Sequence, residues 1–462
     1  MTYSGDRSKR SSDYIDRSPG KIRGTKARGK YRLFLWVYFL VVIFFIGVGQ
    51  VSVNREGAPR EQPVFRFSLP ARPGISFSIG GKLENLVLPL LLLWGLGAIL
   101  DPDLRPGKNP LDPPLLVFLG VAFLSFVFSP FRELSWQGGL RELLLGGGFL
   151  VVARVLLAPI RRRKIAVALL FISVGISALA GLYLFSRQIY FPDTPQRIWL
   201  SFMHPNTTGS VLLLLIPLGI SLSIGGFSRL PRVICGLTTV LFGLTMILTF
   251  SRTAWMGLLI ASGVLVMYWR LRFYLLGALA LLAALLLVGV NIGPQTYLQD
   301  RVKSISSFTH DPNISKRLIY WEGVFRMIGT RPFLGYGPGY RVFMEVYERD
   351  FLEIPTGEDP VHAHNIYLAL GAGIGIPGLL AFLWLLQASF GVIHRGKNRE
   401  KEKFQRYYGR GLTAGLAGFL VAGLADNPLF SFRVMLVLWF LLAAASAGEN
   451  RFFRVVKGAR VG

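Results

Sequence analysis

Long apolar runs recur along the whole chain, and they limit its possible folds more than any other feature. A helix that crosses a membrane needs about 20 consecutive, mostly apolar residues, because lipid offers no partner to exposed backbone groups. Many runs here reach that length, and only 16% of the residues are charged. The sequence therefore predicts an all-α, polytopic membrane helix bundle.

The runs predict about twelve transmembrane helices. Pro89, Pro217 and Pro377 fall inside runs, and helices in lipid tolerate them because neighbouring groups bond the freed carbonyls. The predicted spans are residues 33–49, 83–100, 113–129, 138–158, 165–185, 206–225, 233–250, 253–269, 272–290, 364–392, 409–425 and 430–447.

Three polar segments flank or separate these spans. Residues 1–32 are basic with few apolar side chains, which predicts a disordered cytoplasmic arm drawn to anionic lipid. Residues 33–290 hold the first nine spans, residues 364–447 hold the last three, and residues 448–462 form a basic cytoplasmic tail. The segment 291–363 is rich in Arg, Glu, Gly and Pro, so we expect it to fold as a large loop domain outside the lipid.

The basic residues indicate which side of the membrane each connection occupies. The formal net charge is +26, which in a soluble protein would suggest nucleic acid. Here Lys and Arg gather in alternate connections at the membrane borders, as they do in short cytoplasmic loops. This placement excludes nucleic acid as the expected partner, and it predicts cytoplasmic termini with the 291–363 domain on the outer (periplasmic) face. The single cysteine, Cys235, excludes a disulfide within the chain.

Two arginines on the outer side are candidates for function. Arg252 lies in a very short turn between the seventh and eighth spans, so its guanidinium must stay close to the bundle. An arginine that only reaches the interface is the alternative, but ionisable groups at membrane depth are functional candidates. Arg317 lies in the first turn of a predicted helix, where the helix dipole disfavours a cation and indicates an anionic partner, either a ligand or Glu322 of the same helix. The apolar side chains of that helix, expected to pack on the bundle, are Leu318, Trp321, Phe325 and Ile328.

The outer segment ends in glycines and histidines. Residues 335–339, named the glycine-rich loop below, can bring backbone close to a ligand or form a plain turn. His362 and His364 lie where the chain re-enters the membrane, and the chain has only five His. A metal site is one interpretation, but the spacing is no recognised zinc pattern. A general base is favoured because imidazole takes up a proton near pH 7, and His364 is preferred because it directly precedes a rigid span.

In order, spacing and sidedness, these residues resemble a family of bacterial membrane glycosyltransferases: the O-antigen ligases and polymerases, with the related O-oligosaccharyltransferases. The resemblance covers residues 200 to 430. It rests on His204-Pro-Asn206, Ser251-Arg252, Arg317 with Tyr320-Trp321, the run from Arg331 to Gly339, and His362-Ala-His364-Asn365.

The resemblance implies a GT-C-like fold in the bacterial cytoplasmic (inner) membrane. It implies an enzyme that transfers a glycan from undecaprenyl diphosphate to an acceptor on the outer face, without metal or another cofactor. In such enzymes two arginines hold the diphosphate and a histidine acts on the acceptor, which implies Arg252, Arg317 and His364. Asp426 is similar to an acid that recurs in the ligases. The other expected substrate-binding residues are His362, Arg331, Tyr336 and Asn365.

Within this class, an O-antigen ligase with lipid A-core as acceptor is the favoured interpretation. A polymerase of O-antigen or exopolysaccharide and a protein O-oligosaccharyltransferase are the alternatives, because they share the donor chemistry. A nucleotide-sugar enzyme would need an acidic metal motif, and Asp101-Pro-Asp103 lies on the cytoplasmic side, where it is expected to cap a turn.

Two other classes compete with a transferase. A transporter of lipid-linked sugars should carry polar residues along several spans and show two similar halves. Here the central spans are nearly pure Leu, Val, Ala and Gly, and the polar groups gather at the outer end. A scaffold protein would not need Arg252 or the histidine pair. The sequence ranks the transferase first, the transporter second and the scaffold last.

Overall fold

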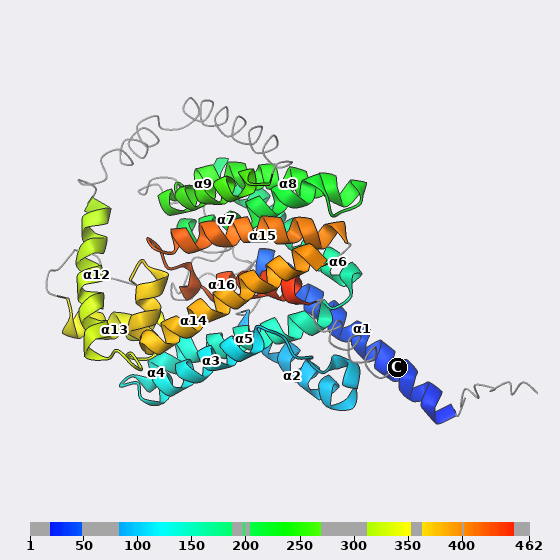
Figure 1. Cartoon of the computed structure of the whole chain (residues 1–462), viewed down its shortest axis with the longest axis horizontal. Coiled ribbons are helices and arrows are strands. Elements are labelled where there is room, and N and C mark those ends of the chain that lie inside the picture. Colours follow the sequence, from blue (N-terminus) through cyan, green and yellow to red (C-terminus); the bar gives the residue numbers. More distant parts are fainter. Residues whose placement is uncertain are drawn as a thin grey trace, which may run out of the picture.

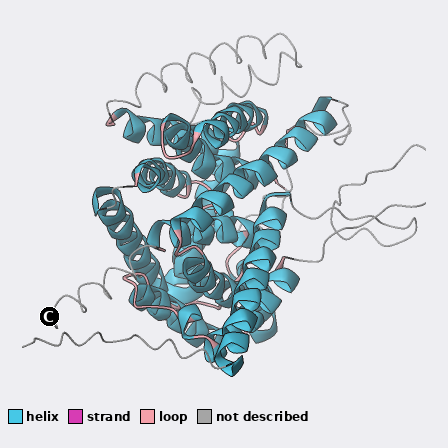
Figure 2. Cartoon of the chain, turned by 90° about the vertical axis from the view of Figure 1, so that its right-hand side faces the viewer, coloured by secondary structure: helices cyan, strands magenta, loops and turns pink. Residues whose placement is uncertain are grey.

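The computed structural model describes residues 19–48, 83–186, 197–198, 204–268, 312–352, 363–399 and 402–447. Every regular element in this part of the chain is helical, as Figure 2 shows. This agrees with the predicted all-α class. Residues 1–18 of the predicted basic arm, the whole of the basic tail and His362 lie outside the described residues, whereas residues 19–32 of the arm, expected to be disordered, belong to a helix that begins at Pro19.

Eleven of the predicted spans fall on a helix, and the span at 272–290 lies outside the described residues. The eleven helices are α1 (Pro19–Val48), α2 (Glu84–Leu100), α3 (Asp112–Val127), α5 (Arg141–Leu156), α6 (Ile160–Ser186), α7 (Pro205–Ile224), α8 (Arg229–Leu248), α9 (Arg252–Val266), α14 (Ile366–Arg399), α15 (Lys403–Ala422) and α16 (Phe432–Ser446). The shorter or outer elements are η1 (Pro102–Leu104), α4 (Arg132–Ser135), the π-helical turn η2 (Trp136–Leu140), α12 (Pro312–Thr330), α13 (Tyr340–Asp350) and η4 (Pro428–Phe430).

Several of these helices have the length and composition of membrane spans. Among the described residues, α1, α6, α7, α8 and α14 are long and apolar enough to cross a membrane, and α2, α3, α9 and α16 are shorter apolar helices. Outward faces are apolar as well: Leu88, Leu92 and Leu96 recur every fourth residue of α2 and are exposed. Soluble proteins rarely leave such stripes in water. The fold is that of a membrane protein, while the number of spans stays a prediction.

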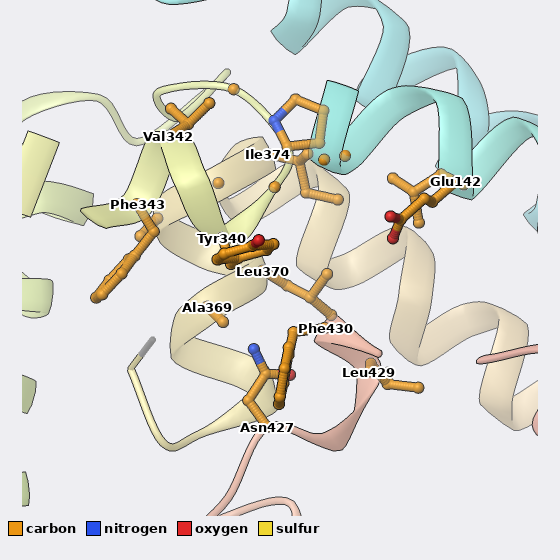
Figure 3. A pocket seen from close by; sticks show the side chains of 18 of the residues that line it. Glu142, Tyr340, Val342, Phe343, Ala369, Leu370, Ile374, Asn427, Leu429 and Phe430 are labelled. Carbon is orange, nitrogen blue, oxygen red and sulfur yellow. The ribbon is translucent and has the colours of Figure 1, made fainter. Parts of the chain in front are cut away.

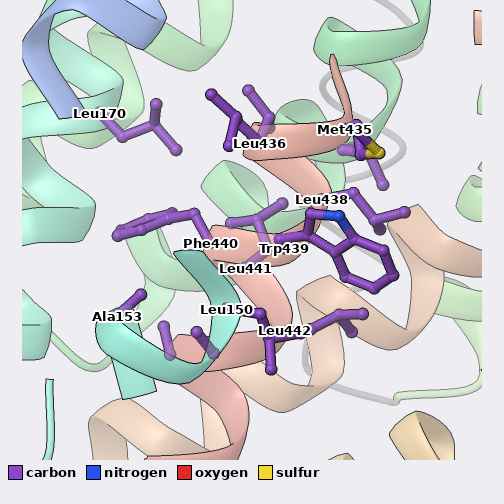
Figure 4. Packing of buried hydrophobic residues seen from close by; sticks show 14 of the residues in the cluster. Leu150, Ala153, Leu170, Met435, Leu436, Leu438, Trp439, Phe440, Leu441 and Leu442 are labelled. Atoms are coloured by element: carbon purple, nitrogen blue, oxygen red, sulfur yellow. The ribbon is translucent and has the colours of Figure 1, made fainter. Parts of the chain in front are cut away.

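Two helices form the centre of the bundle. All side chains of α16 from Val434 to Ser446 are buried, and a helix that is buried on every face belongs inside a bundle. Figure 4 shows α16 residues such as Phe440 packed among Leu150 and Ala153 of α5 and Leu170 of α6. The second central helix is α7, buried from residue 207 to residue 219 and packed against α8 and α15.

The helices α12 and α13 cover one end of the bundle, and Figure 1 shows α12 lying across the ends of the long helices. Together with the start of α14 they enclose a second, smaller core. The packing face of α12 differs from the prediction: Leu318 and Phe325 are exposed, whereas Tyr320, Val324 and Met327 are buried. The expected face was wrong because the segment is apolar on more than one side, so spacing alone did not identify the buried stripe.

The opposite end of the bundle is closed by polar contacts. Arg32 Nη2 of α1 donates to Asp101 Oδ1 at 2.7 Å, and Asp101 accepts from the backbone N–H of Asp103 at 3.1 Å. Asp101 therefore caps η1, which is the turn role that the sequence indicated for this Asp-x-Asp. The Arg32 hydrogen bond also holds the pKa of Asp101 below its ordinary value.

Candidate active site at the covered end of the bundle

His364 stands directly before α14 in a constrained backbone conformation. Its φ is +47°, in the left-handed region that costs about 1–2 kcal/mol for most residues with a side chain. Asn365 caps α14, since its Oδ1 accepts from the N–H groups of Tyr367 at 2.9 Å and Leu368 at 3.0 Å. Its Nδ2 donates to the Leu424 carbonyl at 2.9 Å. These bonds fix His364 between the start of α14 and the end of α15.

Asp426 and Tyr320 flank the His364 ring. Nδ1 of His364 lies 3.8 Å from Oδ1 of Asp426, whose side chain is almost fully buried. The Tyr320 ring is nearly parallel to the imidazole, with centroids 6.4 Å apart and planes at 13°. The carboxylate lies beyond hydrogen-bond distance of Nδ1, but its negative charge favours a proton on that atom, which makes Nε2 the proton acceptor that a general base needs. The His364 side chain is 29% exposed, so a ligand can reach it.

Arg317 lies on the helix that meets His364. The Trp321 Nε1–H of α12 donates to the Ala363 carbonyl at 2.9 Å, which anchors α12 beside the re-entry point. Residues three and four apart share a helix face, so Arg317 lies on the same side of α12 as Tyr320 and Trp321. One expectation needs correction: α12 begins at Pro312, so Arg317 lies in its second turn and the helix dipole acts on it only weakly.

Arg252 is the first residue of α9 and follows a tight turn. Phe250 has a φ of +49°, and Trp255 Nε1 donates to the Met246 carbonyl at 3.1 Å, which closes the end of α8. The helices α9 and α15 pack antiparallel, with the backbones of Gly257 and Gly418 in contact. Because α9 begins where α15 ends, Arg252 lies at the same end of the bundle as Asp426 and His364.

The glycine-rich loop docks on a break in α14. Gly375 has a φ of +73° and interrupts the helix, which frees the carbonyls of the preceding turn. The N–H of Tyr336 donates to Ala372 O at 3.0 Å, and the N–H of Gly337 donates to Gly373 O at 2.9 Å. In the described contacts, the close backbone approach that the glycines permit is to α14 and to Gly138 and Gly139 of η2.

Two predicted substrate-binding residues, Arg331 and Tyr336, lie against each other. The Arg331 guanidinium stands 4.9 Å from the centre of the Tyr336 ring, and the Tyr336 hydroxyl lies 2.8 Å from the Thr330 hydroxyl. Arg331 is exposed and Tyr336 is largely buried. Their predicted role in binding substrate stays a prediction, as does that of His362.

A cavity of about 120 Å³ lies beside these residues (Figure 3). Its lining comes from the glycine-rich loop, η4 and the helical elements α3, η2, α5, α12, α13, α14 and α16. It is mostly apolar and aromatic, with Tyr340, Leu370 and Phe430 grouped together in Figure 3 and Glu142 as its charged residue. Ile366 and Asn427 also line it, and they are close in sequence to His364 and Asp426. An apolar part of a ligand could therefore be accommodated next to the histidine and the carboxylate.

Two residues that were not assigned a role also join this end. Arg197 donates from Nε to the Thr249 carbonyl and from Nη2 to Asn206 Oδ1, both at 2.8 Å, and so ties the start of α7 to the turn before Arg252. His204 caps α7 through Nδ1, which accepts from the Asn206 N–H at 3.2 Å. The signal for His204 was its place in the run His204-Pro-Asn206. Arg197 carried no signal beyond its charge.

The described residues contain no group of three His, Cys, Asp or Glu side chains that could hold a metal ion. What they bring together is a histidine beside a carboxylate, with two arginines at the same end of the bundle. The fold and this site define a polytopic helical membrane protein in which a histidine, a carboxylate and two arginines gather at one end.

Comparison with known families agrees with this description. Residues 237–383 match the family described as O-antigen ligase, which confirms the resemblance drawn from the sequence. The matched region begins within α8 and ends within α14, so it includes Arg252, Arg317 and His364, whereas His204 and Asp426 lie outside it. A search of the curated proteins found no match.

Proposed function

We propose that this chain transfers a glycan from undecaprenyl diphosphate to an acceptor on the outer face of the bacterial cytoplasmic (inner) membrane, with both termini cytoplasmic. The family match supports a glycosyltransferase of the O-antigen ligase or polymerase type. The observation that carries the proposal is the pairing of His364 with Asp426 at the end of the bundle where Arg252 and Arg317 also lie.

In the proposed reaction His364 acts on the acceptor. A sugar hydroxyl is a weak nucleophile until a base removes its proton, and an imidazole oriented by a carboxylate is suited to that step. The acceptor oxygen then forms a bond to the anomeric carbon of the donor glycan as the bond from that carbon to the diphosphate breaks. Asp426 stabilises the imidazolium that forms.

Arg252 and Arg317 act on the leaving group. Negative charge develops on the diphosphate as it departs, and arginine binds phosphate oxygens through two N–H groups while keeping its charge. Guanidinium groups already in position stabilise this charge more in the transition state than in the ground state. They supply the positive charge that a metal would otherwise bring, so the proposed reaction needs no metal.

The acceptor that we favour is lipid A-core, which would make the chain an O-antigen ligase. The family match, described as O-antigen ligase, supports this choice, and the apolar lining of the cavity beside Asn427 suits the lipid part of either substrate. A growing glycan, in a polymerase, or a protein hydroxyl, in an O-oligosaccharyltransferase, are the alternatives, because the donor half of the site would be the same.

The experiment is a product assay. Membranes that contain the protein are given undecaprenyl-diphosphate-linked glycan together with lipid A-core, free glycan or an acceptor protein, and the products are separated by mass. We expect glycan joined to lipid A-core and release of undecaprenyl diphosphate. Joining to either other acceptor would replace ligase by the matching alternative. Movement of intact lipid-linked glycan across the vesicle membrane, without any glycan joined to an acceptor, would favour a transporter.

A further inference from the structure

His204 lies among the charged groups of the site but has no part in the chemistry above. We infer that its imidazole binds the lipid-diphosphate donor, by donating the Nε2–H to a phosphate oxygen. This inference rests on the proposed function and adds a neutral hydrogen-bond donor to the two arginines.

The first argument concerns which ring nitrogen carries the proton. Nδ1 of His204 accepts the backbone N–H of Asn206 at 3.2 Å, so this nitrogen carries no proton. A neutral imidazole has one N–H, which is then on Nε2 at the far side of the ring. The capping bond thus fixes both the tautomer and the direction in which the ring presents a donor.

The second argument concerns location. The η4 turn, which directly follows Asp426 and Asn427, lies against α7, the helix that His204 caps. Asp426 and His364 are near enough for their charges to act on His204 in opposite directions. The ring is therefore part of the same polar cluster as the proposed base.

The third argument concerns the side of the cluster that His204 occupies. The Arg197 guanidinium donates to the side-chain Oδ1 of Asn206 and to the backbone carbonyl of Thr249, each at 2.8 Å. Thr249 belongs to the turn that places Arg252 at the start of α9. His204 and Arg252 are thus held on one rigid unit, which favours the diphosphate as the ligand that they share.

The charge state of the ring agrees with this role. His204 is exposed in part, and the protein around the rest of the ring lowers its pKa, as does nearby Arg197, against the opposing effect of Asp426. A neutral ring keeps its Nε2–H and its capping bond over the physiological pH range. A charged histidine would instead protonate Nδ1 and lose the cap.

The test separates capping from ligand binding. Asn is among the best N-cap residues, so His204→Asn keeps an acceptor for the Asn206 N–H but is too short to replace the Nε2–H. The matched control is His394→Asn, because His394 is exposed at the far end of α14. Binding of undecaprenyl diphosphate to the purified full chain in detergent is measured, together with the melting temperature of each variant without ligand.

We expect His204→Asn to melt as the unsubstituted protein does and to bind the diphosphate lipid at least tenfold more weakly. His394→Asn should bind normally. His204→Ala, which loses both functions, should melt earlier and bind as weakly as His204→Asn. Equal binding by His204→Asn and the unsubstituted protein would show that His204 only caps α7, and the proposed function would stand. No binding by the unsubstituted protein would overturn both.

Discussion

Arginine and lysine differ at a phosphate site in more than size. A guanidinium presents a planar fork of N–H groups that matches two phosphate oxygens, whereas an ammonium is a compact point charge. The positions of Arg252, at the start of α9, and Arg317, on the face of α12 that meets the re-entry segment, suit two such forks at one end of the bundle. Charge alone should therefore not maintain the activity.

We predict that Arg252→Lys and Arg317→Lys each lose at least about tenfold in glycan transfer while the protein accumulates normally. The double variant should be little worse than either single one, since groups that act together are not additive. Arg349→Lys is the control, because Arg349 is exposed on α13 and pairs with Asp350 at 2.7 Å. Transfer and membrane content are measured on the same preparations. Full activity of Arg252→Lys would remove that residue from the site.

At the scale of single elements, helices were predictable from the sequence because each requires a continuous apolar run. Pro377 indicated that the Gly373 carbonyl has no donor within α14, but the docking of the glycine-rich loop on it was not predictable, since the break at Gly375 and the segment that bonds the carbonyl depend on the folded structure. The buried face of α12 was not predictable for the same reason. It is set by contacts with α13 and α14 and not by the spacing of apolar residues along α12.

The break in α14 should be sensitive to a single methyl group. Gly375 has a φ of +73° and a ψ of 175°, a conformation nearly restricted to glycine, and an added Cβ would clash with the Phe333 carbonyl. We predict that Gly375→Ala destabilises the protein by about 1–3 kcal/mol. Gly263→Ala, in α9 with no neighbouring atom within 4 Å of an added Cβ, should change stability by less than about 1 kcal/mol. Thermal melting in detergent compares the two, and equal melting would contradict the proposed role of the break.

At the scale of the whole molecule, the alternation of helix ends and the distribution of basic residues define two sides. Arg32, Asp101 and Asn109 gather at one end, and the site lies at the other. The sequence indicated these two groups because each span reverses the direction of the chain. It could not indicate that Asp426 approaches the His364 ring to 3.8 Å, since the two residues are brought together only by the packing of α14 on α15.

From this arrangement we predict which end of the bundle lies outside the cytoplasm. In a Cys235→Ala background, Glu348→Cys on α13 should react with a membrane-impermeant maleimide in spheroplasts, because α13 covers the end that we propose to face outward. Lys108→Cys, between α2 and α3, should react only after the membrane is opened. Both positions are exposed in the structure. Labelling of Lys108→Cys alone would invert the proposed orientation. Labelling of both variants in closed spheroplasts would contradict the placement of the two positions on opposite sides of the membrane.

The central claim is that His364 is the base of a metal-free glycan transfer. The measurement is transfer from undecaprenyl-diphosphate-linked glycan by purified protein in EDTA, comparing the unsubstituted chain with His364→Ala and with His364→Asn, which tolerates the left-handed backbone at this position. We predict normal transfer by the unsubstituted chain and none by either variant, with binding of the donor lipid retained in all three. A fully active His364→Ala, or transfer that returns only when divalent metal is added to the unsubstituted chain, would contradict the account.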